Sequence, residues 1–461
     1  SCQDTPNINE ELKIVRYSKP SSNIRFDLDV EPNITIPNIK SIDYAPATIE
    51  LGESMGVRST LKVEFGDHRS PDTDNTGDNY ISERDYDPYE VGSYWGKFEA
   101  RYPFIRGANI WWIQGTDKQE LADMERRQFV VDSFSGVGSG GVFTIIAKDL
   151  LKLTEGRNSM SPVASVGRIS ADINDSVTSV TLNPTGVGSQ YPASGLAAIG
   201  GKEVVSFTRS GDIFTIVRAQ YNTEAQAHTI DDSFQLCNEY TSQQANDVFY
   251  DLLVNYAGVD PAYIPVSDWA AESSAKLGGR LYSSLICQPT SVKDLINELL
   301  QQTASSMFWD NQANLIRWQV LDNKESSDAT FDRSNMVKGS FGVTQQLKKR
   351  VSRVWVFYGQ INPLLELTDK RNYSTTVVNV EPESEVQYNG EPSIREIYSR
   401  WISSTTRDTA IRLSELILQR YSQPPRKVSF KLLRDSGVYI PELSGSYDTT
   451  RIYLNKIKRV M

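Results

Sequence analysis

The sequence predicts a mainly β protein of several domains, with an α+β insert between two β-rich blocks. The chain has 461 residues, and domains of about 100–200 residues give about three or four of them. Apolar and polar residues alternate in both the N-terminal and the C-terminal parts, as they do in half-buried strands. Helical periodicity is concentrated in 241–325 and in one insertion further on.

Residues 1–155 form the first predicted β block. Strand-like alternation runs through 41–51 and 59–67. Two further strand-like runs, 127–134 and 141–150, are joined by the glycine-rich stretch "SGVGSGG". Glycine permits the positive φ angles of a tight or bulged hairpin, so these two runs are expected to pair.

Residues 156–240 are predicted to form a small β-barrel inserted as a unit. Short strand-like runs alternate with turns in this segment, and long helical periodicity is lacking. The stretch Arg209–Asp212 reads "RSGD", which predicts the turn of a hairpin.

Residues 241–325 are predicted to form a small α+β domain. A first helix is expected to begin at Thr241, with Gln244 completing a capping box, and to end at Gly258. A second helix is expected over 291–306. The following stretch then reads as a hairpin that turns at Asn311–Asn314.

Residues 326–461 form the second β block, which carries a helical insertion. The predicted strands share β-branched and aromatic residues, and they are 352–360, 373–380, 426–433 and 450–460. The predicted helices are 393–403 and 406–422, the second ending before Pro424 and Pro425.

The bulk composition excludes some classes of protein. The net charge of −10 argues against a nucleic-acid binder, which normally presents a basic face. No run of about 18 apolar residues suggests a membrane span, and no secretory signal is recognisable. Cys2, Cys237 and Cys287 form neither a disulfide framework nor a metal-binding spacing, which favours folding in a reducing cytosol.

One acidic segment resembles a calcium-binding loop. In "DTDNTGDNYISE" oxygen-bearing residues and a glycine follow the spacing of an EF-hand loop, although Asn79 replaces the usual apolar residue and Pro71 precedes the loop. Two interpretations stay open, a calcium site and a solvated acidic loop. The candidate ligands are Asp72, Asp74, Thr76, Asp78 and Glu83. No other cofactor is predicted.

The sequence predicts no enzyme. Its two histidines, His68 and His228, are far apart in the chain, and no G-x-S-x-G motif surrounds a serine. Structural roles are therefore expected for both histidines. Asp27 and Asp29 alternate on a strand-like run, but solvated strand charges are the commoner arrangement. A glycosidase or peptidoglycan hydrolase remains the alternative from this class.

The segment 92–115, "GSYWGKFEARYPFIRGANIWWIQG", is unusually aromatic. Pro103 interrupts a regular strand, so we expect a turn at 101–106 followed by a strand at 108–114. That strand has apolar residues on both faces, which predicts either a core strand or a strand at a protein interface. The candidate interface residues are Trp95, Tyr102, Phe104, Trp111 and Trp112.

Several stretches, taken in order, resemble one known family. They include "VEFGDH", "YDPYEVGSYWGKFEARYPFIRGANIWWIQG", "RQFVVDSF…FTIIAKDLLKL" and "EVVSFTRSGDIFTIVRAQYNTEAQAHTIDDSFQLC". Further on they include "DVFYDLLVNYAGVD", "LINELLQQTASSMFWDNQANLIRWQVL" and "IREIYSRWIS…LSELILQRYSQPP". Together they resemble the tail hub (baseplate hub or tail-tip hub) of long-tailed bacteriophages over nearly the whole chain.

The resemblance implies an architecture and a set of partners. Two β-barrel-like tube domains would flank the small β-barrel and the α+β domain, and three chains would form a ring of six tube domains. The implied partners are further copies in a homotrimer, the tail tube or distal tail protein, the tip fibre or spike protein, the tape-measure protein, and DNA passing through the channel. The implied location is the distal tail tip of the virion, after assembly in the host cytoplasm.

Two expectations accompany this resemblance. Hubs of the family usually continue with further strands beyond a segment like "RIYLNKIKRVM", so the chain is expected to be a fragment or a member whose remainder lies elsewhere. The alternative function is a glycan-binding adhesin of the same particle, with its sugar site in 156–240.

Overall fold

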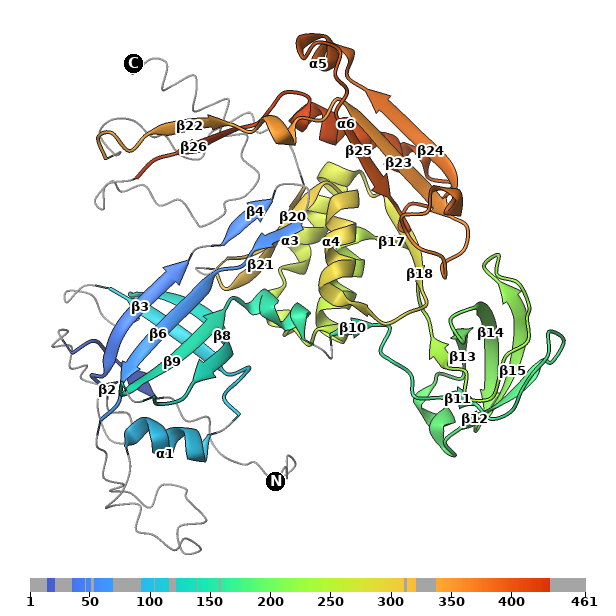
Figure 1. Cartoon of the computed structure of the whole chain (residues 1–461), viewed down its shortest axis with the longest axis horizontal. Helices are drawn as coiled ribbons and strands as arrows, with labels where there is room; N and C mark the ends of the chain where they lie inside the picture. The colour runs from blue at the N-terminus through green and yellow to red at the C-terminus, as the bar shows by residue number, and fades with distance from the viewer. Residues whose placement is uncertain are drawn as a thin grey trace, which may run out of the picture. The chain divides into compact units, whose positions relative to one another are not determined.

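The structure is a computed structural model, and the chain divides into two compact units (Figure 1). Unit 1 comprises Ser1–Ala47 and Arg58–Lys152, and unit 2 comprises Thr48–Val57 and Leu153–Met461. Strands dominate both units, which confirms the predicted mainly β class. The structure describes residues 15–20, 35–45, 47–50, 54–68, 93–102, 104–115, 122–138, 140–156, 159–310, 313–320 and 337–431.

Unit 1 is built on a five-stranded antiparallel sheet in the order β3-β6-β9-β8-β7. Its strands are β3 (Ile39–Ala45), β6 (Thr60–Gly66), β7 (Asn109–Gln114), β8 (Glu125–Ser135) and β9 (Val142–Lys148). These strands confirm the predicted alternation and the β8–β9 hairpin. A short parallel pair, β1 (Arg16–Tyr17) and β2 (Thr35–Ile36), also belongs to unit 1. The 3-10 helix Leu150–Glu155 contains the point at which the chain passes from unit 1 to unit 2.

Helix α1 (Tyr94–Arg101) covers one face of this sheet, in a segment for which the sequence predicted no helix. The Oδ1 atom of Asp67 accepts a hydrogen bond from the backbone N–H of Trp95 at 3.0 Å, which satisfies one free donor of the first turn. The Trp95 ring stacks on that of Phe143 at 4.4 Å, and Phe98 packs beside it. Aromatic residues at helical spacing therefore close the core of unit 1.

The sheet of unit 1 curls into a half-barrel. The ring of Tyr44 in the edge strand β3 lies 5.4 Å from that of Trp112 in the opposite edge strand β7. Contact between the two ends of a five-stranded sheet requires strong twist and curvature. The described residues of unit 1 thus form an open, barrel-like sheet whose concave side holds the core.

In unit 2, residues 168–236 form the predicted small β-barrel. Its strands follow the order β11-β12-β15-β14-β13-β16. A bridge between Arg168 and Ser233 joins the two ends of the sheet, so that the barrel is nearly closed. Gly211, with φ +61°, makes the predicted hairpin turn. The strands are β11 (Arg168–Ile169), β12 (Ser179–Asn183), β13 (Ser194–Ile199), β14 (Glu203–Ser210), β15 (Ile213–Gln220) and β16 (Phe234–Leu236), and the 3-10 helix Val187–Gln190 follows β12.

The next segment of unit 2 has the predicted α+β composition. The described strands are β17 (Asn238–Gln244), β18 (Leu281–Ile286), β20 (Ser305–Asp310) and β21 (Leu315–Val320), paired as β17–β18 and β20–β21. The helices are α2 (Ala245–Asp251), α3 (Val266–Glu272) and α4 (Val292–Gln302), with π-helical turns at Leu252–Tyr256 and Ser273–Leu277 and a 3-10 helix at Pro261–Tyr263. The predicted capping box is wrong, because Thr241 and Gln244 lie in β17 and no side chain caps α2. Gly258, with φ +69°, does end this helical segment.

Two short pairs of strands bring distant parts of the chain into this segment. The hairpin of β4 (Thr48–Glu50) and β5 (Ser54–Val57) belongs to unit 2, although the strands before and after it belong to unit 1. The backbone N–H of Met55 donates to Asn297 Oδ1 of α4 at 3.0 Å. Strand β10 (Met160–Ser161) pairs with β19 (Thr290–Ser291), directly before α4.

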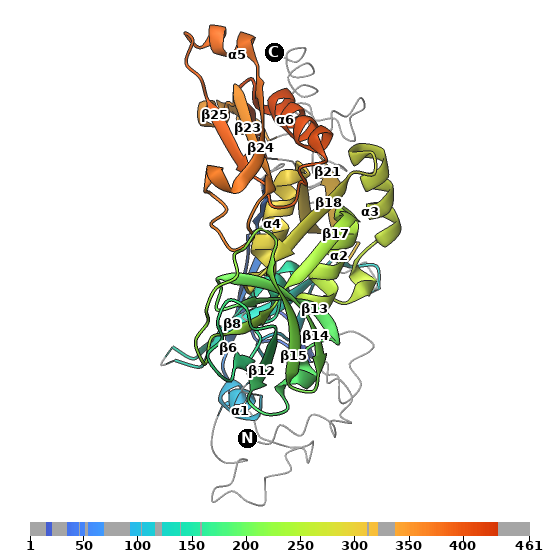
Figure 2. The ribbon, with the colours of Figure 1, turned by 90° about the vertical axis from the view of Figure 1, so that its right-hand side faces the viewer.

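The last described part of unit 2 is a three-stranded sheet, β24-β23-β25, against which α6 packs (Figure 2). Its elements are β23 (Arg353–Gln360), β24 (Tyr373–Val380), α5 (Pro382–Gln387), β25 (Ile394–Tyr398) and α6 (Arg407–Tyr421), with 3-10 helices at Leu347–Lys349 and Lys370–Asn372. Strands β23 and β24 and helix α6 match the prediction. The predicted helix over 393–403 is wrong, because β25 pairs in parallel with β23 along its whole length and buries Ile397. A separate ribbon pairs β22 (Gly342–Gln345) with β26 (Arg426–Ser429).

Candidate assembly surface

Among the described residues of unit 1, the outer face of β7 is the most prominent aromatic surface. Strand β7 is an edge strand, paired with β8 alone among the described strands. Side chains alternate along it, and Trp111 is 47% exposed while Ile113 is 39% exposed. Tyr102 and Phe104, in the turn before the strand, are also exposed, Phe104 at 83%. We call Tyr102, Phe104, Trp111 and Ile113 the β7 surface.

The opposite face of β7 is fixed to the core of its own unit. Ile110 and Trp112 pack against the hydrophobic cluster of the half-barrel. The guanidinium of Arg127 lies 4.9 Å from the ring centre of Tyr44 and 5.4 Å from that of Trp112. Its Nη2 also donates to Glu125 Oε1 at 2.8 Å. The strand is therefore held firmly from one side, while its other side presents large apolar groups to solvent.

This combination suits protein–protein contact. An edge strand offers backbone N–H and C=O groups that can pair with a strand of another chain. Aromatic side chains such as Trp111 and Phe104 are enriched in interfaces, where their burial adds to the backbone pairing. The geometry thus favours addition of a neighbouring strand to the half-barrel.

The structure separates the five predicted interface residues. Trp95 is fully buried in the core of unit 1, so its side chain is not available to a partner. Trp112 is half-buried against Tyr44. Tyr102, Phe104 and Trp111 are exposed together in one stretch of chain. The predicted turn at 101–106 begins too early, because Arg101 still belongs to α1, and the described turn lies within 104–107. The predicted strand at 108–114 corresponds to β7.

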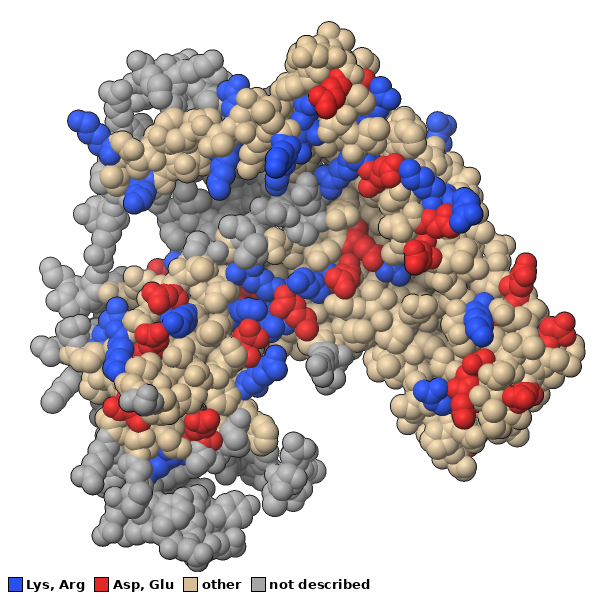
Figure 3. Space-filling model, viewed as in Figure 1, with Lys and Arg blue, Asp and Glu red and all other residues tan. Residues whose placement is uncertain are grey.

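The β22–β26 ribbon is a second distinctive surface, which was not predicted from the sequence. Residues 337–349 and 425–431 contain six Lys or Arg and no Asp or Glu (Figure 3). None of the six forms an ion pair with another described residue. They are Lys338, Lys348, Lys349, Arg426, Lys427 and Lys431. We call these six residues the basic ribbon. The signal was present in the sequence, but the two stretches lie about 80 residues apart and meet only through strand pairing.

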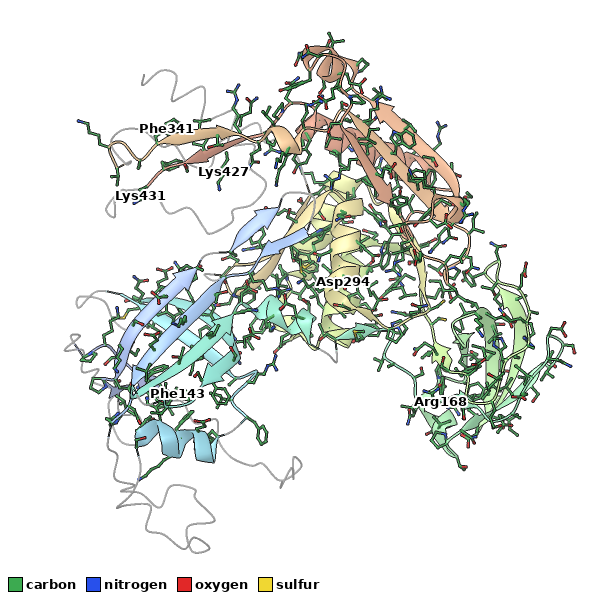
Figure 4. All side chains as sticks on the ribbon, viewed as in Figure 1. Phe143, Arg168, Asp294, Phe341, Lys427 and Lys431 are labelled. Atoms are coloured by element: carbon green, nitrogen blue, oxygen red, sulfur yellow. The ribbon has the colours of Figure 1, made fainter. Side chains whose placement is uncertain are left out.

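The ribbon is also two-sided. Val343 lies opposite Val428, and Phe341 is two positions before Val343 on the same face. Lys427 lies opposite Thr344, with its side chain on the other face. Lys431, four residues later, lies on the same face as Lys427 (Figure 4). A two-stranded ribbon is marginally stable by itself in water. Contact with another surface would therefore stabilise it, through apolar contacts on one face and ion pairs on the other.

The barrel contains a buried charged network that connects several of its loops. Arg218 donates to both carboxylate oxygens of Glu203, at 2.8 and 2.6 Å. His228 Nε2 lies 3.1 Å from Glu203 Oε2, and His228 Nδ1 lies 3.3 Å from Asp232. Burial alone would raise the pKa of Glu203, but hydrogen bonds from Arg218, His228 and two backbone amides outweigh it and lower that pKa to about 2. Because Glu203, Arg218 and His228 are buried or nearly so, this network ties the barrel together and offers little to an external ligand.

The remaining predicted sites do not come together in the described residues. His68 stacks on Tyr94 with ring centres 5.0 Å apart, which is a packing role. The calcium-loop candidates Asp72, Asp74, Thr76, Asp78 and Glu83 lie outside the described residues, as do Asp27, Asp29 and Cys2. No three acidic, histidine or cysteine residues within the described ranges are grouped as a metal site. Among the described helices, none combines the length and the apolar character needed to cross a bilayer.

Comparisons with known proteins give a weak structural similarity. No protein-family model matches the chain, and no curated protein matches it significantly. Among solved structures, the chain is similar to the 43 kDa tail protein of prophage MuSo2 from Shewanella oneidensis. The TM-score is 0.34 at 8% sequence identity, over 88% of this chain and 84% of that chain. Function is therefore inferred from this chain's own residues and their geometry.

Proposed function

We propose that this chain is a structural protein of a bacteriophage tail, a hub at the distal end that joins the tail tube to the tip fibre or spike. One observation carries the proposal: the half-barrel of unit 1 ends in an edge strand whose outer face presents Trp111 and Ile113. The ordered resemblance of the sequence to tail hubs supports the same assignment. Its role is assembly, with no catalytic step.

The β7 surface supplies the contact between copies in this proposal. Strands β3 and β7 are the two ends of the unit 1 sheet, so each end can accept a strand from a neighbour. Head-to-tail contacts of this kind form a closed ring when the rotation between neighbours is right. Three copies, each supplying two barrel-like domains, would form a ring of six. Burying Trp111 and Phe104 in this contact would remove the largest exposed apolar groups of the strand and its preceding turn.

The test is the oligomeric state of the full chain at micromolar concentration. Mass photometry and electron microscopy of the unaltered chain should give a trimeric ring. The double substitution Trp111→Ser with Ile113→Ser should give a folded monomer with an unchanged circular dichroism spectrum. The matched control is Ile213→Ser with Val217→Ser, which removes two exposed apolar side chains from the barrel instead. Rings in all three proteins would refute the role of the β7 surface, and a monomeric unaltered chain at tens of micromolar would refute self-assembly.

A further inference from the structure

Two of the three cysteines face each other where the barrel joins the β17–β18 pair. Asn238 lies opposite Ile286, and Glu239 lies opposite Leu285. One step further along this register places Cys237, directly before β17, opposite Cys287, directly after β18. Opposed residues of an antiparallel pair have Cα atoms about 4.5–5.5 Å apart, within the range that disulfides span.

Both thiols lie in one small apolar cluster. Cys287 is 3% exposed and packs with Ala198, Val204 and Leu285, and Cys237 packs against the same group. Ala198 and Val204 come from the barrel, whereas Leu285 comes from β18. The cysteines thus lie where the chain passes from the last barrel strand, β16, into β17.

The surroundings of Cys237 keep its thiol protonated. The neighbouring Cys287 thiol, burial, and the carboxylate of Glu239 all raise the pKa of Cys237. Glu239 also accepts a hydrogen bond from the hydroxyl of Tyr221. Because the thiolate is the reactive form, Cys237 reacts slowly at neutral pH. A reducing cytosol would leave the pair as two free thiols.

We propose that Cys237 and Cys287 form an oxidisable dithiol site, which closes to an intramolecular disulfide when the protein is exposed to a low-molecular-weight disulfide outside a reducing compartment. The Cys237 thiolate attacks one sulfur of that reagent and releases one thiolate. The Cys287 thiolate then attacks the Cys237 sulfur of the mixed disulfide and releases the second. Two protein thiols lose two electrons in all, and the reagent leaves as two thiols that carry the two protons.

The bond would fix the exit of the barrel. It would join residue 237, at the end of the barrel, to residue 287, at the end of β18, in addition to the hydrogen bonds of the β17–β18 pair. Local opening at this junction would then become rarer. The proposal concerns only this junction, and it does not depend on the oligomeric state of the chain.

The experiment uses the full chain, purified with its thiols reduced and then incubated with oxidised glutathione at pH 8. Thiols are counted under denaturing conditions, and crosslinked peptides are mapped by mass spectrometry. We expect the count to fall from three to one, a peptide linking Cys237 to Cys287, and unchanged mobility as a single chain on a non-reducing gel. Hydrogen exchange at residues 236–239 should slow at least tenfold on oxidation and recover with reductant.

Variants separate this pairing from other thiol chemistry. Cys2→Ser should fall from two thiols to none, whereas Cys237→Ser and Cys287→Ser should give no internal crosslink. If either of these two variants fails to fold, peptide mapping of the unaltered chain still decides the matter. A count that stays at three, glutathione adducts without a crosslink, or a crosslink to Cys2 would each refute the proposal.

Discussion

Trp111 and Trp112 are adjacent in β7, yet their side chains lie on opposite faces of the unit 1 sheet. Trp111 is 47% exposed, whereas Trp112 packs 5.4 Å from Tyr44 on the core side. The alternation of a strand imposes this division. Two identical neighbouring side chains therefore have different expected roles, one in association and one in folding.

Replacing the two tryptophans separately should divide these roles. Trp112→Ala should lower the free energy of unfolding of unit 1 by about 2–4 kcal/mol, since it opens a cavity beside Tyr44 and Arg127. Trp111→Ala should change it by less than about 0.5 kcal/mol, as is usual for exposed positions. Denaturant unfolding, monitored through hydrogen exchange of the β7 and β8 amides, measures the free energy of unfolding of each variant. Equal losses in the two variants would contradict the assignment of faces.

The barrel should lose stability in acid through Glu203. Its pKa in the folded chain is about 2, below the ordinary value of 4.5. The folded state therefore favours the carboxylate, and this contribution is complete above pH 4.5 and is lost as pH falls from 4.5 to 2. Hydrogen exchange of the β14 and β15 amides can be measured between pH 6 and pH 3 and corrected for intrinsic rates. The protection of these amides should fall as the pH drops below 4.5.

The substitution Glu203→Gln tests the same network at constant pH. It leaves Arg218 buried without its carboxylate partner, so the barrel should lose about 3–5 kcal/mol of stability at pH 7. The variant should also lose most of the acid dependence between pH 4.5 and 2. Glu224→Gln, on an exposed barrel residue, is the control and should behave as the unaltered chain does. Retained acid dependence in Glu203→Gln would assign the titration to another group.

Association through the basic ribbon should depend on salt. The chain carries a net charge of −10 although the ribbon contributes six positive charges, so in the proposed ring an acidic surface of a neighbouring copy would be the complementary partner of the ribbon. Lys427→Glu with Lys431→Glu should weaken ring assembly at least tenfold at 50 mM salt and less at 500 mM, because exposed charges are screened. Sedimentation across this salt range measures the degree of assembly of the variant and of the unaltered chain. Lys202→Glu with Arg407→Glu makes the same charge change elsewhere, and equal weakening there would point to net charge alone.

Gly359 should tolerate no side chain. It lies in β23 with φ +71°, and an added Cβ would come 2.8 Å from the Cβ of Ser404 and also meet the Ser374 hydroxyl. Gly359→Ala should therefore cost about 2–4 kcal/mol, combining backbone strain with overpacking. Gly390 is the control, because it has φ +78° and an added Cβ there would meet no atom within 4 Å. Gly390→Ala therefore measures the cost of backbone strain alone. In thermal unfolding, the melting temperature of Gly359→Ala should lie well below that of Gly390→Ala. Similar melting temperatures would mean that backbone strain alone causes the loss of stability.

Much of the local structure follows from the sequence alone. Alternation identified β6, β8, β9, β23 and β24, because an antiparallel or half-buried strand repeats its apolar residues every second position. The 3.6-residue period identified α4 and α6 in the same way. The glycines at 211 and 258 have the positive φ angles expected of a turn and a helix end. These features depend on residues close together in the chain, so the sequence determines them directly.

Other features were decided only by contacts between distant residues. The segment 94–101 became a helix because Trp95 and Phe98 find Phe143 on a strand more than 40 residues away. Residues 394–398 became a strand because β23 supplied an edge for parallel pairing. Pairing of β17 with β18 brought Cys237 beside Cys287, and pairing of β22 with β26 gathered the six basic residues. The local pattern shows which face of an element is apolar, but only the tertiary fold decides what covers that face.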